Sequence, residues 1–229
     1  MRNGQASAEG SDTTHRKLET LAVFAATLLA ATLLVQLVPV LDRSSSWLAI
    51  GCALVVSYFL SDLVSGLVHW AFDRVFDEHT PVLGPSFVRP FREHHDDPAG
   101  ITRHDFIELN GNTCMAAAPV LAVARVALDP ADGNIVVVFA VAFIAFFATW
   151  TVLTNQFHKW SHQADPPPLA RLLQRYHIVL ARDHHAGHHK PPFDTRYCIT
   201  SGVMNRWIDR SGLLLAAETW ILSRRRRTK

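Results

Sequence analysis

The sequence is poor in cysteine, in glycine-rich motifs and in net charge, and each of these absences excludes a class of site. Its three cysteines, Cys52, Cys114 and Cys198, form no Cys-x-x-Cys pair, so the sequence supports neither a zinc ribbon, an iron–sulfur cluster nor a disulfide framework. No Gly-x-Gly-x-x-Gly segment marks a nucleotide-binding turn. The formal net charge of +2 argues against general affinity for nucleic acid.

Long apolar stretches are present instead. The mean hydropathy is only +0.12, because apolar blocks alternate with polar, histidine-rich ones. The stretches that predict membrane-spanning helices are 18–41, 47–70, 113–128 and 134–155, of which 113–128 is the shortest and contains Pro119 and Arg125. The stretch 213–222 is too short to cross and is typical of an interfacial or docked helix. We therefore predict an all-α integral membrane protein with about four transmembrane helices.

The distribution of charge predicts how these helices cross the membrane. If the N-terminus is cytoplasmic, segments 1–17, 71–112 and 156–229 lie inside and carry 20 of the 22 lysines and arginines. All thirteen histidines then lie on the cytoplasmic side or at the inner ends of helices. We expect a disordered cytoplasmic N-terminus over 1–17, a membrane domain over 18–212 with a cytoplasmic histidine-rich helical cap, and an interfacial helix with a basic tail over 213–229.

The histidines are clustered at spacings that suit metal binding. The clusters are His69-x-x-x-Asp73, His94-His95, His104-Asp105, His158-x-x-x-His162, His177 and His184-His185-x-x-His188-His189. In a helix, side chains at i and i+4 project from one face, so such pairs chelate one metal ion or bridge two. Imidazole suits iron, zinc and copper alike. One zinc ion needs three or four ligands, whereas this number of histidines fits two metal ions with positions left for O₂. His15 and His79 are expected to be ordinary surface residues.

The loop between the second and third apolar stretches mixes acids, bases and aromatic residues. We expect its carboxylates to orient the ligating imidazoles through their second ring nitrogen; they are Glu93, Asp96, Asp105 and Glu108. Its arginines, Arg89, Arg92 and Arg103, are candidates to meet a lipid phosphate, with solvation as the default. Asn155, one turn before His158, is either a water-linked ligand of one metal ion or a helix–helix hydrogen-bond donor.

A redox metal inside a membrane scaffold points to the oxidation of lipid chains. Removing hydrogen from an unactivated C–H bond is beyond any side-chain acid, base or nucleophile, and needs an oxidant made from O₂ by a metal. A membrane protein lets an acyl or alkyl chain reach the metals while the head group stays at the surface. Because the sequence has no nucleotide fingerprint, we expect electrons to come from a separate cytochrome b5-type or ferredoxin-type carrier.

Several long segments carry a resemblance to a known family. They are GLVHWAFD (66–73), RPFREHHDDPAGITRHDFIELNGN (89–112), TNQFHKWSH (154–162) and YHIVLARDHHAGHHKPPFDTRYCITSG (176–202). In order and content they resemble the plasmanylethanolamine desaturase family, whose members include animal enzymes of plasmalogen synthesis, the myxobacterial protein CarF and plant plastid fatty acid desaturase 4. The resemblance covers roughly residues 50–210. It implies a di-iron, O₂-dependent lipid desaturase, with formation of the vinyl ether of a plasmalogen from alkyl ether phosphatidylethanolamine as the expected reaction.

The resemblance also implies the site residues. The expected metal ligands are His69, Asp73, His94, His95, His104, His158, His162, His177, His184, His185, His188 and His189. All of these except His104 and His177 are expected to be catalytic, and Asn155, Glu93 and Asp105 are expected to support the metal ions. The resemblance leaves desaturation or hydroxylation of a phospholipid acyl chain as the alternative reaction. A metal sensor or transporter is the alternative outside enzymes. The expected location is the bacterial inner membrane in a bacterium and the endoplasmic reticulum in a eukaryote.

Overall fold

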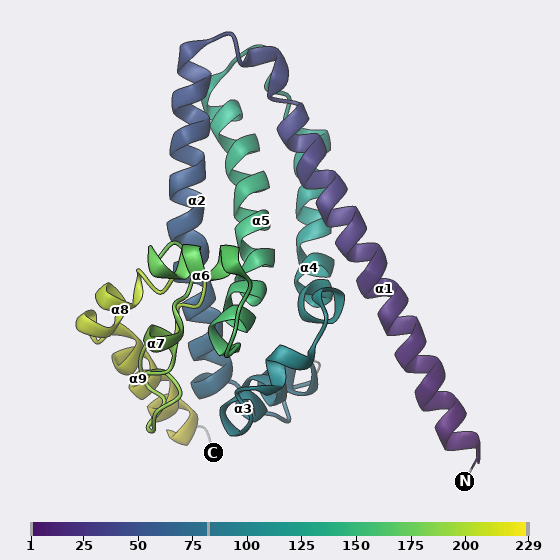
Figure 1. Ribbon diagram of the computed structural model, residues 1–229, viewed down its shortest axis with the longest axis vertical. Coiled ribbons are helices and arrows are strands. Elements are labelled where there is room, and N and C mark those ends of the chain that lie inside the picture. Colours follow the sequence, from purple (N-terminus) through teal and green to yellow (C-terminus); the bar gives the residue numbers. More distant parts are fainter. Residues whose placement is uncertain (1, 82, 228–229) are drawn as a thin grey trace. The chain divides into compact units, whose positions relative to one another are not determined.

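The structure, a computed structural model, describes residues 2–81 and 83–227 (Figure 1). Within this part of the chain there is no strand, which confirms the all-α prediction. The α-helices are α1 (Arg2–Val35), α2 (Ser44–Trp70), α3 (Arg89–Asp96), α4 (Phe106–Ala127), α5 (Ile135–His162), α6 (Pro168–Arg175), α7 (Arg182–His185), α8 (Asn205–Ser211) and α9 (Leu213–Arg227). Short 3₁₀ or π turns are η1 (Val38–Val40), η2 (Ala71–Val75), η3 (Gly84–Val88) and η4 (Gly100–Arg103).

Four segments are long and apolar enough to cross a membrane, as predicted. They are Thr13–Val40, Ser44–Val75, Phe106–Ala127 and Ile135–His162. The third starts before the predicted stretch 113–128, because Asp105 caps α4 by accepting hydrogen bonds from the backbone N–H groups of Ile107 and Glu108. The segment 1–17, expected to be disordered, is helical from Arg2 onward.

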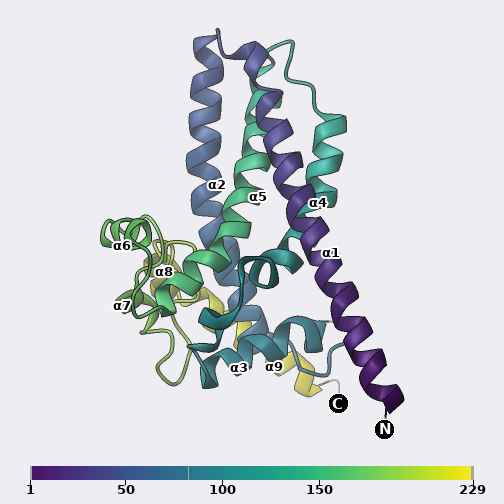
Figure 2. The same cartoon turned by 45° about the vertical axis from the view of Figure 1, so that its right-hand side comes forward.

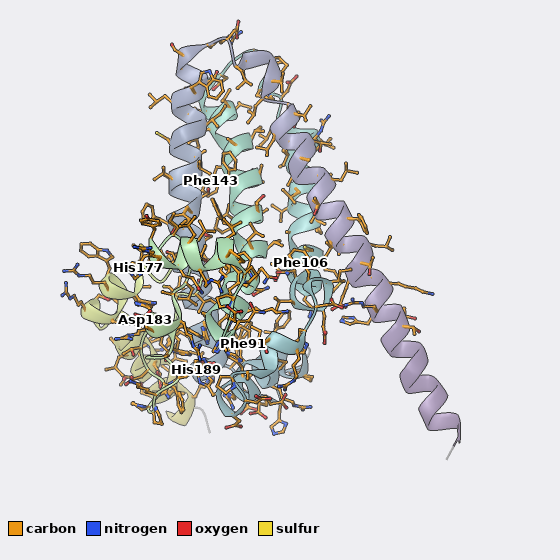
Figure 3. All side chains as sticks on the ribbon, viewed as in Figure 1. Phe91, Phe106, Phe143, His177, Asp183 and His189 are labelled. Carbon is orange, nitrogen blue, oxygen red and sulfur yellow. The ribbon has the colours of Figure 1, made fainter. Side chains whose placement is uncertain are left out.

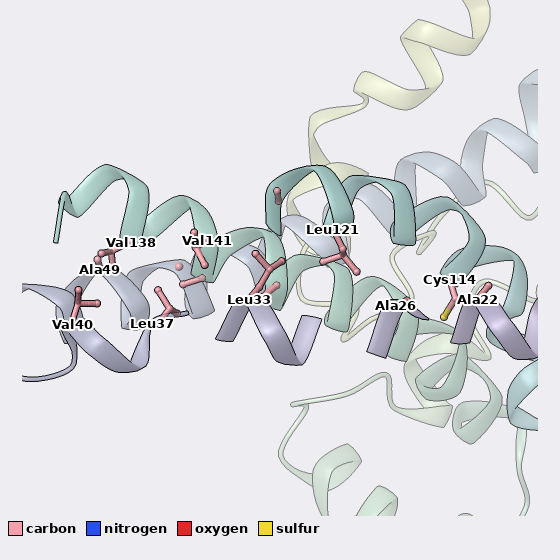
Figure 4. Packing of buried hydrophobic residues seen from close by; sticks show 14 residues of the cluster. Ala22, Ala26, Leu33, Leu37, Val40, Ala49, Cys114, Leu121, Val138 and Val141 are labelled. Carbon is pink, nitrogen blue, oxygen red and sulfur yellow. The ribbon is translucent and has the colours of Figure 1, made fainter. Parts of the chain in front are cut away.

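The chain forms two compact units. Unit 1 consists of Met1–Tyr58 and His104–Gln156, and unit 2 of Phe59–Arg103 and Phe157–Lys229. In unit 1, α1 and α4 lie side by side in both ribbon views (Figures 1 and 2). Buried alanine, valine and leucine side chains from α1, α2, α4 and α5 make its core (Figure 4). Small residues permit this close packing, and a Cβ added to Gly111 of α4 would lie 2.5 Å from Glu19 Cβ of α1.

A buried carboxylate organises unit 2. Asp62 lies within α2 with no exposed surface. Its Oδ1 accepts hydrogen bonds from the backbone N–H groups of Thr200, Ser201 and Gly202 at 2.8–3.1 Å, and its Oδ2 accepts one from Met204 at 3.0 Å. The loop 197–204 is therefore held against α2 through its main chain. The four hydrogen bonds offset the cost of placing a charge in an apolar helix.

The same loop approaches α2 closely at a second point. A Cβ added to Gly66 would lie 2.4 Å from Cys198 Sγ, so no larger residue fits at position 66 without a shift of the loop. Ser65 also accepts a hydrogen bond from the N–H of Ile199 at 3.1 Å. The end of α2 and the loop 197–204 are thus matched in shape as well as in hydrogen bonding.

Helix α9 packs against η2, the π turn that follows α2. Arg74 of η2 donates from Nε and Nη2 to the carboxylate of Glu218, which is buried, at 2.8–3.1 Å. Arg225 donates to the carbonyl oxygen of Val75 at 2.5 Å. The stretch 213–222, predicted as an interfacial or docked helix, is therefore docked on η2 along one face, while Leu213 and Trp220 are exposed.

The hydrogen bonds of Asp62 yield a prediction for stability. Replacement of Asp62 by Ala leaves four buried backbone N–H groups without an acceptor, so we expect a loss of about 3 kcal/mol of stability. Ser65→Ala removes the acceptor of one N–H and should cost only about 1 kcal/mol. Thermal unfolding of the detergent-solubilised variants measures both effects. Equal losses for the two variants would contradict this account of the loop.

Candidate metal centre

Unit 2 brings nine potential ligands into two groups. The five-histidine group is His94, His158, His162, His185 and His189, and the carboxylate group is His69, Asp73, His95 and His188. Within each group, one nitrogen or oxygen atom per residue lies within 4.8 Å of every other. The ligands come from α2, η2, α3, α5, α7 and the residues after α7, so segments far apart in the sequence build each group.

In the five-histidine group the ring nitrogens converge. His94 Nε2 lies 3.1 Å from His158 Nε2 and 3.0 Å from His162 Nε2. His185 Nε2 lies 2.8 Å from His158 Nε2 and 3.1 Å from His189 Nε2. The i,i+4 pairs 158/162 and 185/189 predicted from the sequence both contribute. Five imidazole nitrogens that point at one another, rather than at carboxylates, are a donor set compatible with a metal ion.

In the carboxylate group three imidazoles face one oxygen atom. Asp73 Oδ2 lies 3.4 Å from His69 Nε2, 3.0 Å from His95 Nε2 and 3.5 Å from His188 Nε2. Asp73 belongs to the π turn η2, a widened helical turn of the kind that is frequent at functional sites. This group combines three nitrogen donors with one negatively charged oxygen donor, whereas the other group offers nitrogen donors alone.

Backbone carbonyl groups orient two of these imidazoles. His69 Nδ1 lies 3.1 Å from the carbonyl oxygen of Tyr197, and His188 Nδ1 lies 2.7 Å from that of Thr195. A carbonyl only accepts hydrogen bonds, so each Nδ1 carries the proton and each Nε2 is left with its lone pair toward Asp73. For these two histidines the main chain performs the orienting role that was predicted for loop carboxylates.

Unpaired buried atoms show that the residues fit metal ions. Among the described residues, the Nε2 atoms of His69 and His188 and Oδ1 of Asp73 are buried and have no hydrogen-bond partner. Such atoms are costly inside a protein unless another group binds them. A metal ion held by the carboxylate group would use these two Nε2 lone pairs. The donor chemistry of both groups suits iron, and also zinc or copper.

Aromatic side chains surround the carboxylate group. His69 meets Phe91 edge to face at a ring-centroid distance of 5.2 Å, and His95 meets Phe193 at 4.7 Å. Phe72 stacks on Phe87 and contacts Phe91 edge to face. These rings keep water from the ligands and lower the local dielectric constant.

Burial keeps the imidazoles of His94, His185 and His189 neutral. Desolvation and the neighbouring His162 lower the pKa of His94 to about 3. Desolvation and the nearby His94 lower that of His189 to about 3. Desolvation also holds the pKa of His185 well below its usual range. Neutral imidazole is the form that binds metals, so these ligands are ready at neutral pH.

Three predicted ligands lie outside the two groups. His104 belongs to unit 1, where its Nδ1 lies 2.6 Å from Glu108 Oε1. His177 is exposed and lies apart from His189 (Figure 3). His184 Nε2 accepts a hydrogen bond from Asn205 at 3.0 Å, which links His184 to the start of α8.

The predicted supporting residues also lie elsewhere. Asn155 donates to the carbonyl oxygen of Leu109 and to Thr113 Oγ1, both at 3.1 Å, which is the helix–helix alternative of the sequence analysis. Asp105 caps α4 and forms an ion pair with Arg16. Glu93 is exposed on α3. Arg92 and Arg103 are paired with Glu78 and Asp97.

The loop 193–204 is a part of the site that the sequence did not predict. Its contribution comes from main-chain carbonyl and N–H groups, which every residue type possesses, so composition and spacing carry no signal for it. Asp62 was the one available sign, because an acidic residue inside an apolar stretch needs a partner.

The two groups yield a prediction for metal content. We expect two metal ions per chain, one for each group. Asp73→Asn should lower the content to about one, because it removes the charged ligand of one group only. Adding His162→Ala should remove most of the second ion. Elemental analysis of purified protein measures this, with the exposed His79→Gln as the matched control. One zinc ion and no iron would contradict it.

The lowered histidine pKa values yield a prediction for pH. Below a pH of about 6.5, His94, His185 and His189 bind protons in the unfolded chain but stay unprotonated in the folded protein. The free energy of unfolding is therefore highest above this pH and decreases as the pH falls toward 3. Thermal unfolding of chelator-treated protein at decreasing pH measures the loss, and His189→Gln should make it shallower. A melting temperature independent of pH between 7 and about 4 would oppose this account.

The chain is similar in sequence to several known desaturases. The plasmanylethanolamine desaturase of Myxococcus xanthus is 45% identical over 163 residues, 71% of this chain and 57% of that protein. Plasmanylethanolamine desaturase 1 of Mus musculus is 40% identical over 154 residues, 66% of this chain and 57% of that protein. The chloroplastic fatty acid desaturase 4 of Arabidopsis thaliana is 38% identical over 163 residues, 70% of this chain and 48% of that protein. The chain thus aligns with about half the length of these relatives.

No solved structure matches the chain. The family model described as the lipid desaturase domain matches residues 58–228, which contain every residue of the two metal-ligand groups. The resemblance seen in the motifs is thereby confirmed, and the chain belongs to the lipid desaturase domain family.

Proposed function

We propose that the chain is an O₂-dependent oxidoreductase of membrane lipids that forms the vinyl ether bond of plasmalogens with two non-haem iron ions. The observation that carries the proposal is the pair of adjacent ligand groups, which together offer eight imidazoles and one carboxylate. One metal ion for structure or hydrolysis needs half that number. Two ions with several nitrogen ligands each suit redox chemistry with O₂.

The overall reaction removes two hydrogen atoms from adjacent carbons of a lipid chain. In a plasmanyl lipid these are the first and second carbons of the alkyl chain, counted from the ether oxygen. Loss of one hydrogen atom from each converts the alkyl ether into a vinyl ether. O₂ is reduced to two molecules of water by these two hydrogen atoms together with two electrons and two protons from an external donor. Iron, when bound, supplies the oxidant that C–H cleavage needs.

The residues of the chain contribute position and environment. The carbonyl oxygens of Tyr197 and Thr195 fix the ring orientation of His69 and His188. Phe91 and Phe193 pack against the imidazoles of His69 and His95 and shield them from water. Burial also raises the pKa of the Tyr197 hydroxyl, which therefore stays protonated and donates to the carbonyl oxygen of Phe193 at 2.9 Å.

The substrate proposal follows the relatives. Two of them, from a bacterium and an animal, are named plasmanylethanolamine desaturases, which supports alkyl ether phosphatidylethanolamine as substrate. The Arabidopsis relative is named a fatty acid desaturase and supports the second candidate, desaturation of a phospholipid acyl chain at the same site. Both reactions remove two hydrogens from adjacent carbons and require the same metal groups.

Partners and location form part of the proposal. We expect electrons from a cytochrome b5-type or ferredoxin-type protein. The positive-inside distribution supports cytoplasmic N- and C-termini, with the metal groups on the cytoplasmic side. The expected membrane is the inner membrane of a bacterium or the endoplasmic reticulum of a eukaryote.

Lipid profiling tests the reaction. Expression in a host that contains alkyl ether phospholipids but no plasmalogens should produce acid-labile vinyl ethers. His162→Ala or His188→Ala should abolish the product, by at least about 100-fold, because each removes a metal ligand. His79→Gln is the control with full activity. A new acyl double bond without vinyl ethers would reject the plasmalogen reaction in favour of the second candidate. Full activity of either alanine variant would reject that residue as a ligand.

A further inference from the structure

Helix α6 turns an apolar face outward. Leu169, Leu172 and Tyr176 are 60%, 51% and 66% exposed, although they lie at the spacing that usually faces a protein core. The helix instead buries the small Ala170. At about 100° per residue the three large side chains lie within one narrow face, with Arg175 beside it.

This apolar face is held in place by defined contacts. Gln174 donates to the carbonyl oxygen of Leu180 at 3.0 Å. His177 has a φ of 54° and ends the helix in a Schellman motif, with hydrogen bonds from His177 N to Gln174 O and from Ile178 N to Leu173 O. With its positive φ, His177 turns the chain at the end of α6. These hydrogen bonds fix the rotation of α6, so its apolar face points outward.

Hydrogen bonds set the depth of α6 relative to a membrane-crossing helix. Leu180, bound to α6, donates its N–H to Thr200 O at 3.0 Å, and Thr200 donates its own N–H to Asp62 at 3.1 Å. Asp62 lies inside the candidate span Ser44–Val75, roughly 12 Å along the helix axis before the end of α2. The chain also enters α6 only a few residues after the span Ile135–His162 ends. Both constraints tie α6 to the parts of α2 and α5 that belong to unit 2.

We propose that α6 lies in the plane of the membrane interface, with Leu169, Leu172 and Tyr176 inserted among the lipids. Arg175 is then positioned to reach the phosphate groups above them. Helix α8 lies near α6 in both ribbon views (Figures 1 and 2). Its Trp207 is 67% exposed, and tryptophan is enriched at membrane interfaces. The occupant of this face is the phospholipid bilayer. The inference does not depend on which lipid the metal groups act on.

A fluorescent label tests the depth of α6. Leu172→Cys is introduced into full-length protein that carries Cys52→Ala, since Cys114 and Cys198 are buried. The cysteine is labelled with a polarity-sensitive fluorophore, and the protein is reconstituted into phosphatidylcholine vesicles with or without brominated acyl chains. Arg171→Cys, exposed on the other side of the same helix, is the matched control. Unchanged metal content shows that each labelled variant is folded, and Leu169→Cys replaces Leu172→Cys if that variant is not.

Compared with a label at position 171, a label at position 172 should emit at shorter wavelength. Brominated lipid should quench it more strongly, and aqueous iodide should quench it less. Equal quenching by iodide at both positions would overturn the proposal, because the face would then lie in water. Protection of position 172 from both quenchers would also overturn it, and would indicate a second copy of the chain or a protein partner. Loss of lipid product with the depth result intact would affect the proposed function alone.

Discussion

The carboxylate of Asp62 and the main chain of the loop 197–204 form the interaction on which unit 2 depends. The charge sits within an apolar helix, where it is tolerated because four backbone N–H groups surround it. The same loop supplies the carbonyl of Tyr197 to His69, while Gly66 lets the loop approach α2 within contact distance. One electrostatic contact thus fixes the backbone that orients a metal ligand.

The two ligand groups differ in charge and in support. The five-histidine group offers nitrogen donors alone and depends on helical spacing within α5 and around α7. The carboxylate group carries the charge of Asp73, which belongs to η2. An ion pair between Arg74 of η2 and Glu218 of α9 stabilises this turn. A metal ion bound beside a carboxylate is held by charge as well as by lone pairs. The two groups therefore differ chemically as potential metal sites.

The predicted spans and the histidine pairs were recoverable from the sequence because both depend on local periodicity. A long apolar stretch has few alternatives to a membrane helix, and the pairs 158/162 and 185/189 share a face in any helix or helical turn. His104, His177 and His184, which the matched motifs group with the ligands, lie outside the two groups. His177 resembles a ligand in sequence, yet its left-handed backbone serves to end α6. The sequence left two alternatives open for Asn155, and its hydrogen bonds to α4 correspond to the helix–helix alternative.

The sequence by itself determined the number of apolar helices, the clustering of the histidines and the family to which the chain belongs, because each is written in residue type and spacing. Only the tertiary structure decided that nine ligands divide into groups of five and four, and that main-chain carbonyls orient His69 and His188. The reason is physical. Each ligand group joins atoms from segments that are far apart in the sequence, from His69 to His188 in one group and from His94 to His189 in the other. A backbone carbonyl is chemically the same at every position, so only the fold determines which side chain it contacts.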